Sequence, residues 1–230
     1  MAQSKRYNNN FEKINREKEY NLEEAAELLT SFSPPKFDES IEVSINLGVD
    51  PKHADQIVRG TVSLPNGIGK DIKVLVFAKD NLAEEAIKAG ADFVGSDDMV
   101  EKVKGGWTDM DVVVAAPDMM AEVGKLGRVL GPRGLMPNPK VGTVTNDIEK
   151  SVKEVVAGKV EFRVDKLGVI GVSIGKMSFQ KDQLIENIRA CMGAILKAKP
   201  ASVKGIYFKK LTISSTMSPG IKIDKSVFIN

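Results

Sequence analysis

The stretch with the clearest chemical potential runs from Gly124 to Thr143 and has the sequence GKLGRVLGPRGLMPNPKVGT. It holds five glycines, three prolines and no acidic residue. Its four cations are Lys125, Arg128, Arg133 and Lys140. Because glycine and proline at this density disfavour the interior of a helix or strand, we expect a long, ordered basic loop. Backbone amides freed by glycine, next to cations, suit a phosphate group. A rigid connection with a solvated basic edge is the alternative.

Two shorter stretches have residue types that bind RNA. At 36–40 the sequence KFDES places the aromatic Phe37 beside Lys36, and at 214–220 the sequence SSTMSPG offers hydroxyls and a flexible methionine. Aromatic rings stack on bases, and hydroxyls and amides can bind phosphates and 2′-hydroxyls. Composition leaves two alternatives open, which are a core ring for Phe37 and an ordinary turn for the second stretch.

Marks of catalysis and of metal binding are missing from the sequence. The chain has one histidine, His53, and one cysteine, Cys191, and it contains no CxxC or HExxH pattern. None of its Gly-Lys pairs is followed by Ser or Thr, and the expected strand-to-helix turn at 78–81 lacks glycine. We therefore expect no catalytic residue, no metal and no cofactor. An enzyme that binds a nucleotide in the middle of the chain is the runner-up hypothesis.

The elements that must position these residues differ between the ends and the middle of the chain. Alternating strands are expected at 41–47, 56–64, 159–165, 169–175 and 207–216, with amphipathic helices from Asn21 and from Asp182. Residues 72–156 instead alternate buried strands with helices, which is typical of a parallel sheet. We predict an α+β domain from 1–67 and 159–230, with an α/β domain of 68–158 inserted into it.

Several local features are also predicted. Residues 1–20 are expected to form a flexible polar arm, and Asn21 with Glu24 to form a capping box. The strands on either side of Asp165–Gly168 are expected to pair as a hairpin. Asp147 and Asp182 should cap helices, and the buried stripes should include Val156 and Leu196.

Composition and charge indicate a soluble protein with an anionic partner. Hydrophobic residues make up 42% and charged residues 28%, and no apolar run is long enough to cross a bilayer. Residues 68–158 hold 12 cations and 15 acids, whereas 159–230 hold 13 cations and 5 acids. A solvated lysine surface is the alternative to an anionic partner. The single cysteine and the polar start of the sequence predict a cytoplasmic location.

Four runs carry a resemblance to a known family. KFDESIEV, VRGTVSLPNGIGK, the loop of 124–143 and STMSPGIKI together resemble the ribosomal protein L-one family, in its bacterial form. The similarity covers nearly the whole chain. It implies that both chain ends form an RNA-binding domain and that the middle forms a Rossmann-like, three-layer α/β domain.

The resemblance also implies particular contacts. The rRNA-binding positions carry over to Lys36, Phe37, Ser40, Glu42, Asp165, Lys166, Thr216, Met217 and Ser218. Ser40 keeps the hydroxyl of a threonine found in related members, and Ser218 replaces the usual glycine. Lys52 and Arg59 are candidate tRNA contacts on charge and loop position alone. The resemblance does not make the 124–143 loop the main rRNA anchor.

The implied function is structural. The family binds the stalk of large-subunit rRNA beside the tRNA exit site, helps release deacylated tRNA, and in bacteria represses translation of its own operon mRNA. We therefore expect large-subunit rRNA, exit-site tRNA, the operon mRNA and other large-subunit components as partners, no membrane, and a monomer when free. A repressor that acts mainly on mRNA would overlap with this function.

Overall fold

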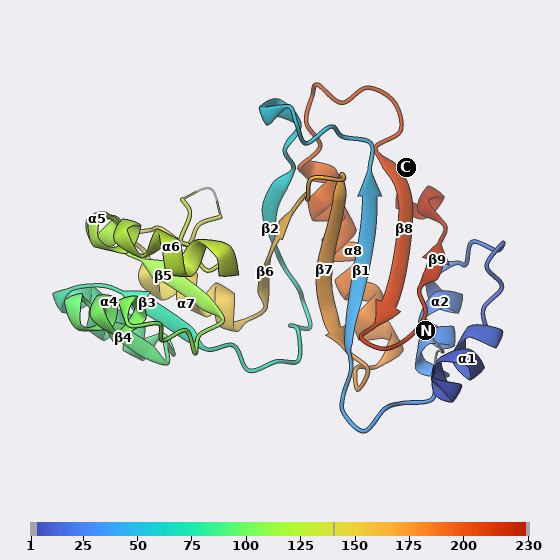
Figure 1. Ribbon diagram of the computed structural model, residues 1–230, viewed down its shortest axis with the longest axis horizontal. Helices are drawn as coiled ribbons and strands as arrows, with labels where there is room; N and C mark the ends of the chain where they lie inside the picture. Colours follow the sequence, from blue (N-terminus) through green and yellow to red (C-terminus); the bar gives the residue numbers. More distant parts are fainter. Residues whose placement is uncertain (1–3, 140, 229–230) are drawn as a thin grey trace. The chain divides into compact units, whose positions relative to one another are not determined.

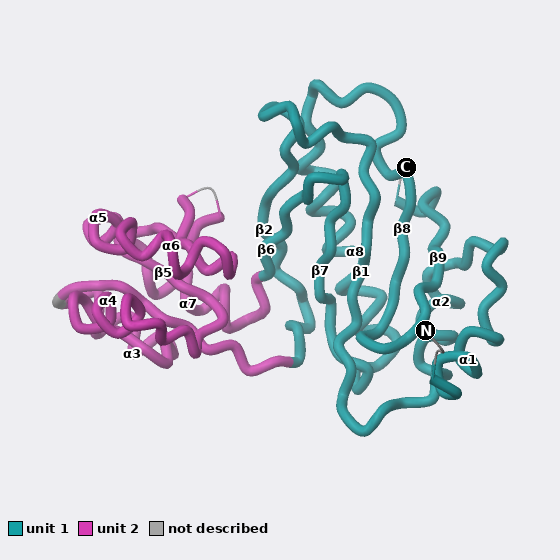
Figure 2. Tube along the Cα trace, viewed as in Figure 1, with its two compact units in different colours: residues 1–69, 160–230 teal, residues 70–159 magenta. Residues whose placement is uncertain are grey.

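The computed structural model describes residues 4–139 and 141–228, and the chain divides into two compact units (Figure 2). Unit 1 is Met1–Gly69 with Val160–Asn230, and unit 2 is Lys70–Lys159. The described strands form a four-stranded, a two-stranded and a three-stranded sheet. This confirms the expected mixed α/β chain.

Unit 1 is built from segments at both ends of the sequence (Figure 1). Its helices are α1 (Lys5–Glu12), α2 (Leu22–Thr30) and α8 (Lys181–Lys197), with 3₁₀ turns η1 (Ala54–Gln56) and η5 (Lys225–Phe228). Its strands are β1 (Ser40–Leu47), β2 (Arg59–Ser63), β6 (Lys159–Arg163), β7 (Val169–Lys176), β8 (Phe208–Ser215) and β9 (Ile221–Ile223). Residue Lys159, which begins β6, belongs to unit 2.

The main sheet has strand order β7-β1-β8-β9 and one covered face. Along β1 the side chains of Ile41, Val43, Ile45 and Leu47 are buried, as the alternation predicts. They share a core with residues of α2 and α8, so these helices cover that face. Figure 1 looks onto the other face, with α8 behind the sheet.

The predicted hairpin of β6 and β7 is wrong. β6 pairs with β2 in a sheet of its own, whereas β7 pairs with β1. The turn between them is held locally, because the Asp165 carboxylate accepts from the amides of Leu167 and Val169, each at 2.8 Å. Gly168 adopts φ +80° in this turn. A tight turn therefore directs the chain from one sheet to the next.

The predicted flexible arm is also wrong for the described residues 4–20. Residues 5–12 form α1, which Ser4 caps by accepting from the amide of Tyr7 at 3.2 Å. Asn10 is fully buried, and its side-chain oxygen accepts from the Ser33 amide at 3.1 Å. Composition suggested a solvated segment, but these few polar residues attach the helix to unit 1.

Two predicted helix starts need correction. The N-cap of α8 is Gln180, which forms a reciprocal capping box with Gln183, so Asp182 lies in the first turn, where the helix dipole favours an acid. Asn21 caps α2 by position but makes no side-chain cap bond. Asp147 caps its helix as predicted, accepting from the Lys150 amide.

Two predicted core positions are exposed instead. Leu196 at the end of α8 is 39% exposed and Val156 at the end of α7 (Ile148–Val156) is 53% exposed. Both lie in the last turn of their helix.

Unit 2 contains a parallel sheet of order β4-β3-β5. Its strands are β3 (Val74–Phe77), β4 (Phe93–Gly95) and β5 (Val112–Ala115), and its longer helices are α3 (Asp80–Lys88), α4 (Asp97–Lys104) and α7. Among the described residues, α3 contacts α7, and α4 contacts α5 (Met120–Val123). All four residues of β3 are buried, as expected of a central parallel strand.

The glycine-rich stretch of 124–143 is not irregular throughout. Its first part forms the turns η3 (Gly124–Leu126), α6 (Gly127–Leu130) and η4 (Gly131–Arg133), after η2 (Pro117–Met119) and α5. Buried Leu126 and Leu130 attach these turns to the core of unit 2, and Gly134 ends them at φ +72°. Glycine density excluded long helices but not single turns between glycines.

Candidate RNA interface

Two segments distant in sequence meet at one end of the main sheet, where β1 begins and β8 ends. The amide of Thr216 donates to the carbonyl of Ser40 at 3.0 Å, and the amide of Ser40 donates to the hydroxyl of Thr216 at 3.1 Å. This pairing brings the KFDES and SSTMSPG stretches together. We call this end of the sheet, with Lys36, Phe37, Ser40, Thr216, Met217 and Ser218, the strand-end surface.

Apolar and cationic groups of the strand-end surface face solvent. Phe37 and Met217 are each 53% exposed, so Phe37 is not a core ring. Lys36 is exposed, and the amine of Lys176 donates to the Ser40 hydroxyl at 3.0 Å. Exposed apolar side chains beside cations and hydroxyls suit a ligand that has both flat bases and phosphates.

A buried acid that the sequence prediction missed organises this surface. Glu39 is 1% exposed, and its carboxylate accepts from the Ser215 hydroxyl at 2.6 Å and from the Met217 amide at 3.0 Å. The Arg6 guanidinium lies 3.6 Å from the same carboxylate and donates to the Met217 carbonyl at 3.1 Å. The turn after β8 is thus held by hydrogen bonds and one partly buried ion pair.

The sequence did contain a signal for Glu39. It stands two residues before Ile41. Because alternate residues of a strand lie on the same face, Glu39 is expected on the buried face of β1. An acid on that face needs partners, because an unpaired buried charge is costly.

Glu42 points to solvent from the uncovered face of the sheet. It pairs with Ser173 of β7 on one side and Ser214 of β8 on the other. One row further, Ser44 lies between Gly171 and Thr212. Small polar residues therefore continue from the strand-end surface across this face.

Asp165 and Lys166 do not join the strand-end surface. In the β1–β7 register Ser40 faces Lys176, whereas Asn46 faces Val169, just after the turn that holds Asp165. At about 3.4 Å per residue, six residues separate the two ends by roughly 20 Å. The predicted rRNA set therefore forms two groups, one at each end of the sheet, with Glu42 on the face between them.

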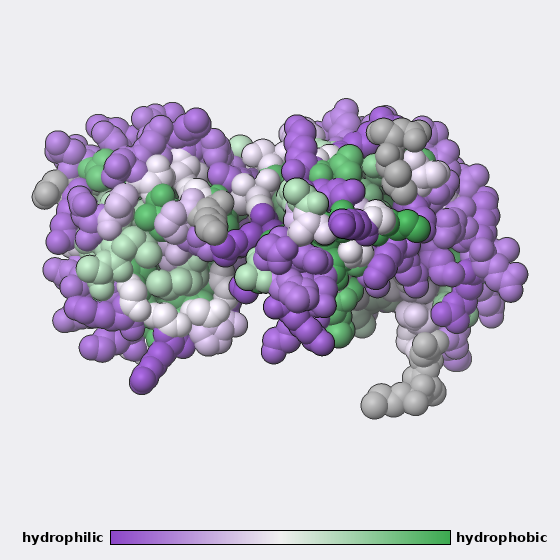
Figure 3. All heavy atoms as spheres, turned by 90° about the horizontal axis from the view of Figure 1, so that it is seen from above, coloured by the Kyte–Doolittle hydropathy of each residue, from purple (hydrophilic) through white to green (hydrophobic). Residues whose placement is uncertain are grey.

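The candidate tRNA residues lie nearer to the second group. Lys52 is exposed in the loop that follows β1, and exposed Arg59 begins β2. Leu167, in the β6–β7 turn, is 81% exposed, and its neighbour Gly168 accepts through its carbonyl from the Leu47 amide. The face of unit 1 in Figure 3 is mostly hydrophilic, with smaller hydrophobic areas.

The basic stretch of unit 2 does not offer the free amides that its glycines predicted. The amides of Gly127, Gly131 and Gly134 donate to carbonyls three or four residues earlier. Lys125 pairs with Glu122 at 2.7 Å, and Arg133 donates to the Thr108 hydroxyl. Arg128 is exposed, and Lys140 lies outside the described residues. This part of the stretch therefore lacks the geometry of a phosphate-binding loop.

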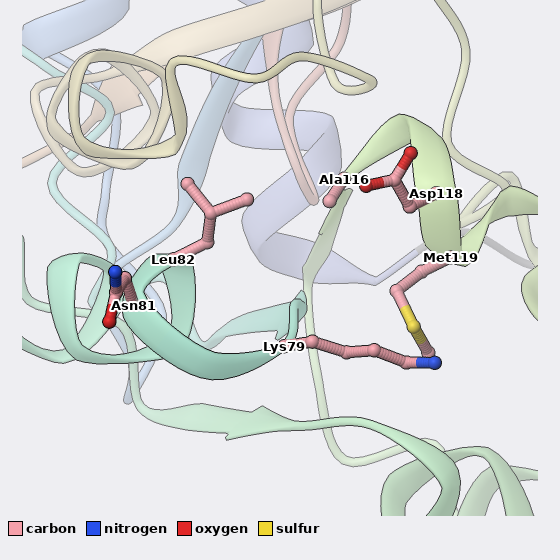
Figure 4. A pocket seen from close by; sticks show the side chains of 6 residues that line it. All are labelled: Lys79, Asn81, Leu82, Ala116, Asp118 and Met119. Atoms are coloured by element: carbon pink, nitrogen blue, oxygen red, sulfur yellow. The ribbon is translucent and has the colours of Figure 1, made fainter.

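A pocket of about 290 Å³ lies at the carboxyl ends of β3 and β5, where parallel sheets often bind ligands. Lys79, Asn81 and Asp118 supply its polar side chains, and Figure 4 shows that these do not converge on one point. None of the residues lining it is a glycine. The pocket therefore has no cradle for a pyrophosphate.

The described part of the chain holds neither a candidate metal site nor a helix that could span a membrane. Between residues 4 and 228, apart from Lys140, no group of three metal-ligating side chains occurs. No helix in those ranges is long and apolar enough to cross a membrane.

The fold and the strand-end surface together define a mixed α/β protein whose main sheet leaves one polar face uncovered. The chain belongs to the Ribosomal protein L1p/L10e family, whose model matches residues 29–219. This confirms the resemblance carried by the four sequence runs. Because this is a family of ribosomal proteins, it also confirms the prediction that the chain is not an enzyme.

Individual relatives are similar over nearly their full length. A protein of Protochlamydia amoebophila is 58% identical over 96% of this chain and 94% of its own. A protein of Chlorobaculum tepidum is 56% identical over 98% of this chain and 97% of its own. Both relatives are called large ribosomal subunit protein uL1.

Proposed function

We propose that this chain is a cytoplasmic component of the large ribosomal subunit that binds the stalk region of large-subunit rRNA. The names of its relatives support a place in the large subunit. The observation that carries the RNA contact is the strand-end surface, where Glu39 orders exposed Met217 beside Ser40 and Thr216.

We propose that the two units are an RNA-binding domain and an inserted Rossmann-like domain. Residues 1–67 and 159–230 would form the first, and residues 68–158 the second, as a three-layer α/β fold. The separate hydrophobic cores of the two units and the parallel β4-β3-β5 sheet support this division.

Each contact at the strand-end surface has a chemical role in this proposal. Phe37 and Met217 pack against bases or riboses, Lys36 binds phosphate, and the hydroxyls of Ser40 and Thr216 bind 2′-hydroxyls. Ser218 is held inward, because its hydroxyl accepts from the Ser215 amide at 2.9 Å. The side chain that replaces glycine at position 218 is thereby directed away from the ligand.

The second group of residues continues this interface in our proposal. RNA that crosses the uncovered face, past Glu42, reaches Asp165 and Lys166 at the far end. Because the Asp165 carboxylate is occupied within its turn, Lys166 supplies the phosphate contact there. Lys52 and Arg59, in the same part of the unit, are the proposed contacts to exit-site tRNA.

We extend the proposal to two activities of the bound protein, which are release of deacylated tRNA and repression of its operon mRNA. An mRNA structure similar to the rRNA stalk could use the same surface, so one interface would serve both RNAs. Free protein would be monomeric and would meet other large-subunit components only in the ribosome.

Hydroxyl-radical footprinting of a stalk rRNA transcript with the full chain tests the proposal. The expected result is a compact footprint. The logarithm of the binding constant should also fall as the logarithm of the salt concentration rises, with a slope of about 0.7–0.9 for each phosphate contact. No footprint, or equal affinity for an unrelated duplex of the same length, would contradict it.

A further inference from the structure

A second, smaller cationic site lies at the edge of the same sheet. A pocket of about 110 Å³ opens between the segment after α1 and strands β8 and β9. Its lining residues are Ile14, Asn15, Arg16, Lys210, Thr212, Gly220 and Lys222. None of the predicted RNA-binding residues is among them.

The pocket lining carries three positive charges and no acid. Arg16 and Lys210 are exposed, and Lys222 is half-buried. Two acids stand next to the lining in sequence: Glu17, which follows Arg16 and is exposed, and Asp224, which follows β9 and accepts from the amide and hydroxyl of Ser226 at 2.9 and 2.7 Å. A pocket with this charge attracts an anion.

The wall formed by the chain's beginning is held in place. Lys222 donates to the Arg16 carbonyl at 2.8 Å, and the Tyr20 amide donates to the Lys222 carbonyl at 2.9 Å. The Arg16 guanidinium lies over the ring of Phe11, 5.4 Å from its centre. These contacts fix the Arg16 backbone and hold its guanidinium and the Lys222 amine beside the pocket, which lowers the entropic cost of using them.

The size of the pocket selects a small anion. Its volume of about 110 Å³ lies well below the roughly 300–1,000 Å³ of pockets for drug-sized ligands. One phosphate group fits this room, and a nucleoside does not.

The pocket opens on the uncovered face of the main sheet. Thr212 pairs with Ser44 on one side and with Lys222 on the other, and Lys210 pairs with Asn46. The neighbours of these residues along the strands, such as Leu211 and Ile221, are buried on the helix side. The pocket thus borders the face that the proposed RNA crosses.

We propose that Arg16, Lys210 and Lys222 bind one backbone phosphate of the RNA, which gives the ordered N-terminal segment a direct part in recognition. This inference rests on the proposed RNA-binding function. It adds an electrostatic contact at the β9 edge, outside both groups of predicted rRNA residues.

The test is a salt titration of binding to a stalk rRNA transcript with the full chain. The double variant Arg16→Gln/Lys210→Gln removes two charges and keeps the Lys222 bond to the Arg16 backbone. We expect affinity at 0.1 M salt to fall roughly three- to tenfold, and the log–log salt slope to fall by about 0.7–0.9, the value for one phosphate. The single variant Lys210→Arg, which keeps the positive charge, should retain most of the wild-type affinity. Lys197→Gln, an exposed lysine of α8 on the covered side, is the matched control.

The outcomes separate this inference from the proposed function. If the wild type does not bind the transcript, the proposed function fails. If the wild type binds and the double variant keeps its affinity and slope, or loses no more than Lys197→Gln does, the phosphate site is overturned. Slower hydrogen exchange at the Thr212 and Lys222 amides in the presence of inorganic phosphate would show that the pocket binds a free anion. If the double variant at the same time leaves RNA affinity unchanged, the proposed RNA contact is overturned.

Discussion

The amide of Met217 donates to the carboxylate of Glu39 at 3.0 Å, across a sequence separation of 178 residues. This bond ties the turn after β8 to the start of β1. The exposed side chain of Met217 therefore depends for its position on a buried acid that does not itself face the ligand.

Replacing that acid should loosen the turn. In Glu39→Gln one carboxylate oxygen becomes an NH₂ group, which faces either the Ser215 hydroxyl or the Met217 amide and cannot accept from it. We expect a loss of about 1–3 kcal/mol in the free energy of unfolding, measured by urea denaturation. Exposed Glu42→Gln, three residues further on, should change it by less than about 0.5 kcal/mol. Equal stability of the two variants would contradict the account.

Arg6 and Glu39 should act as a coupled pair. Arg6→Gln removes the cation 3.6 Å from a buried carboxylate, and Glu39→Gln removes the carboxylate. Because the residues share one network, we expect the double variant to lose less stability than the two single variants together, by about 0.5–3 kcal/mol. Additive losses in a double-mutant cycle would mean that α1 is not attached through this pair.

Substitutions at the strand-end surface should weaken RNA binding without unfolding the chain. Met217→Asp puts an anion where the RNA backbone passes, and we expect at least a tenfold loss, or ~1.4 kcal/mol. Thr216→Val should lower the binding free energy by about 1 kcal/mol, the value of one hydrogen bond to RNA. Filter binding with the stalk transcript measures both. Because the same hydroxyl accepts from the Ser40 amide, urea denaturation must show that the variant keeps its fold.

Two controls lie in unit 2. Ile87→Asp places the same charge at a side chain that is 63% exposed on α3, and Lys70→Ala removes an exposed cation. Losses at either control as large as those at Met217 and Thr216 would count against the assigned surface.

Alkaline pH should destabilise the chain through buried acids of high pKa. Burial raises the pKa of the Cys191 thiol from 9.0 to about 12 and that of the Tyr207 hydroxyl from 10.0 to about 12. Above pH 9 the unfolded chain loses the thiol proton while the folded chain keeps it. The folded state then binds more protons, so stability falls as pH rises, by up to about 1.4 kcal/mol per pH unit for each group.

The variant Cys191→Ala isolates the thiol contribution. Its stability should fall less steeply between pH 9 and 11 than that of the wild type, although the smaller side chain lowers stability at neutral pH. Lysines that titrate in the same range affect both proteins alike. Identical slopes in urea denaturation at each pH would show that Cys191 does not contribute.

Periodicity predicted most elements because burial on one face leaves a pattern in the sequence. The alternation of Ile41 to Leu47 and the apolar run of Val74 to Phe77 are examples, and both are strands. The choice of strand partner leaves no such pattern. The turn at Asp165–Gly168 looks like a hairpin, yet only the pairing of β6 with β2 decides where its two strands lie.

The candidate site was predictable to the extent that its residues are exposed and of RNA-binding type. The resemblance supplied Phe37 and Met217, and the structure shows both exposed. The family positions did not show that Asp165 and Lys166 lie at the opposite end of the sheet, because that depends on strand register. Arg6 was missed because its partners are distant in sequence and two of them are backbone carbonyls.

The most direct test of the central claim compares RNA affinity with and without unit 2. The full chain and a variant in which residues 68–158 are replaced by a short glycine linker are titrated with the same stalk transcript, after circular dichroism has shown that the variant is folded. If unit 1 is the anchor, the two dissociation constants should agree within about threefold. A folded variant that has lost binding by a hundredfold or more would contradict the account and would make the basic stretch of 124–143 a primary contact.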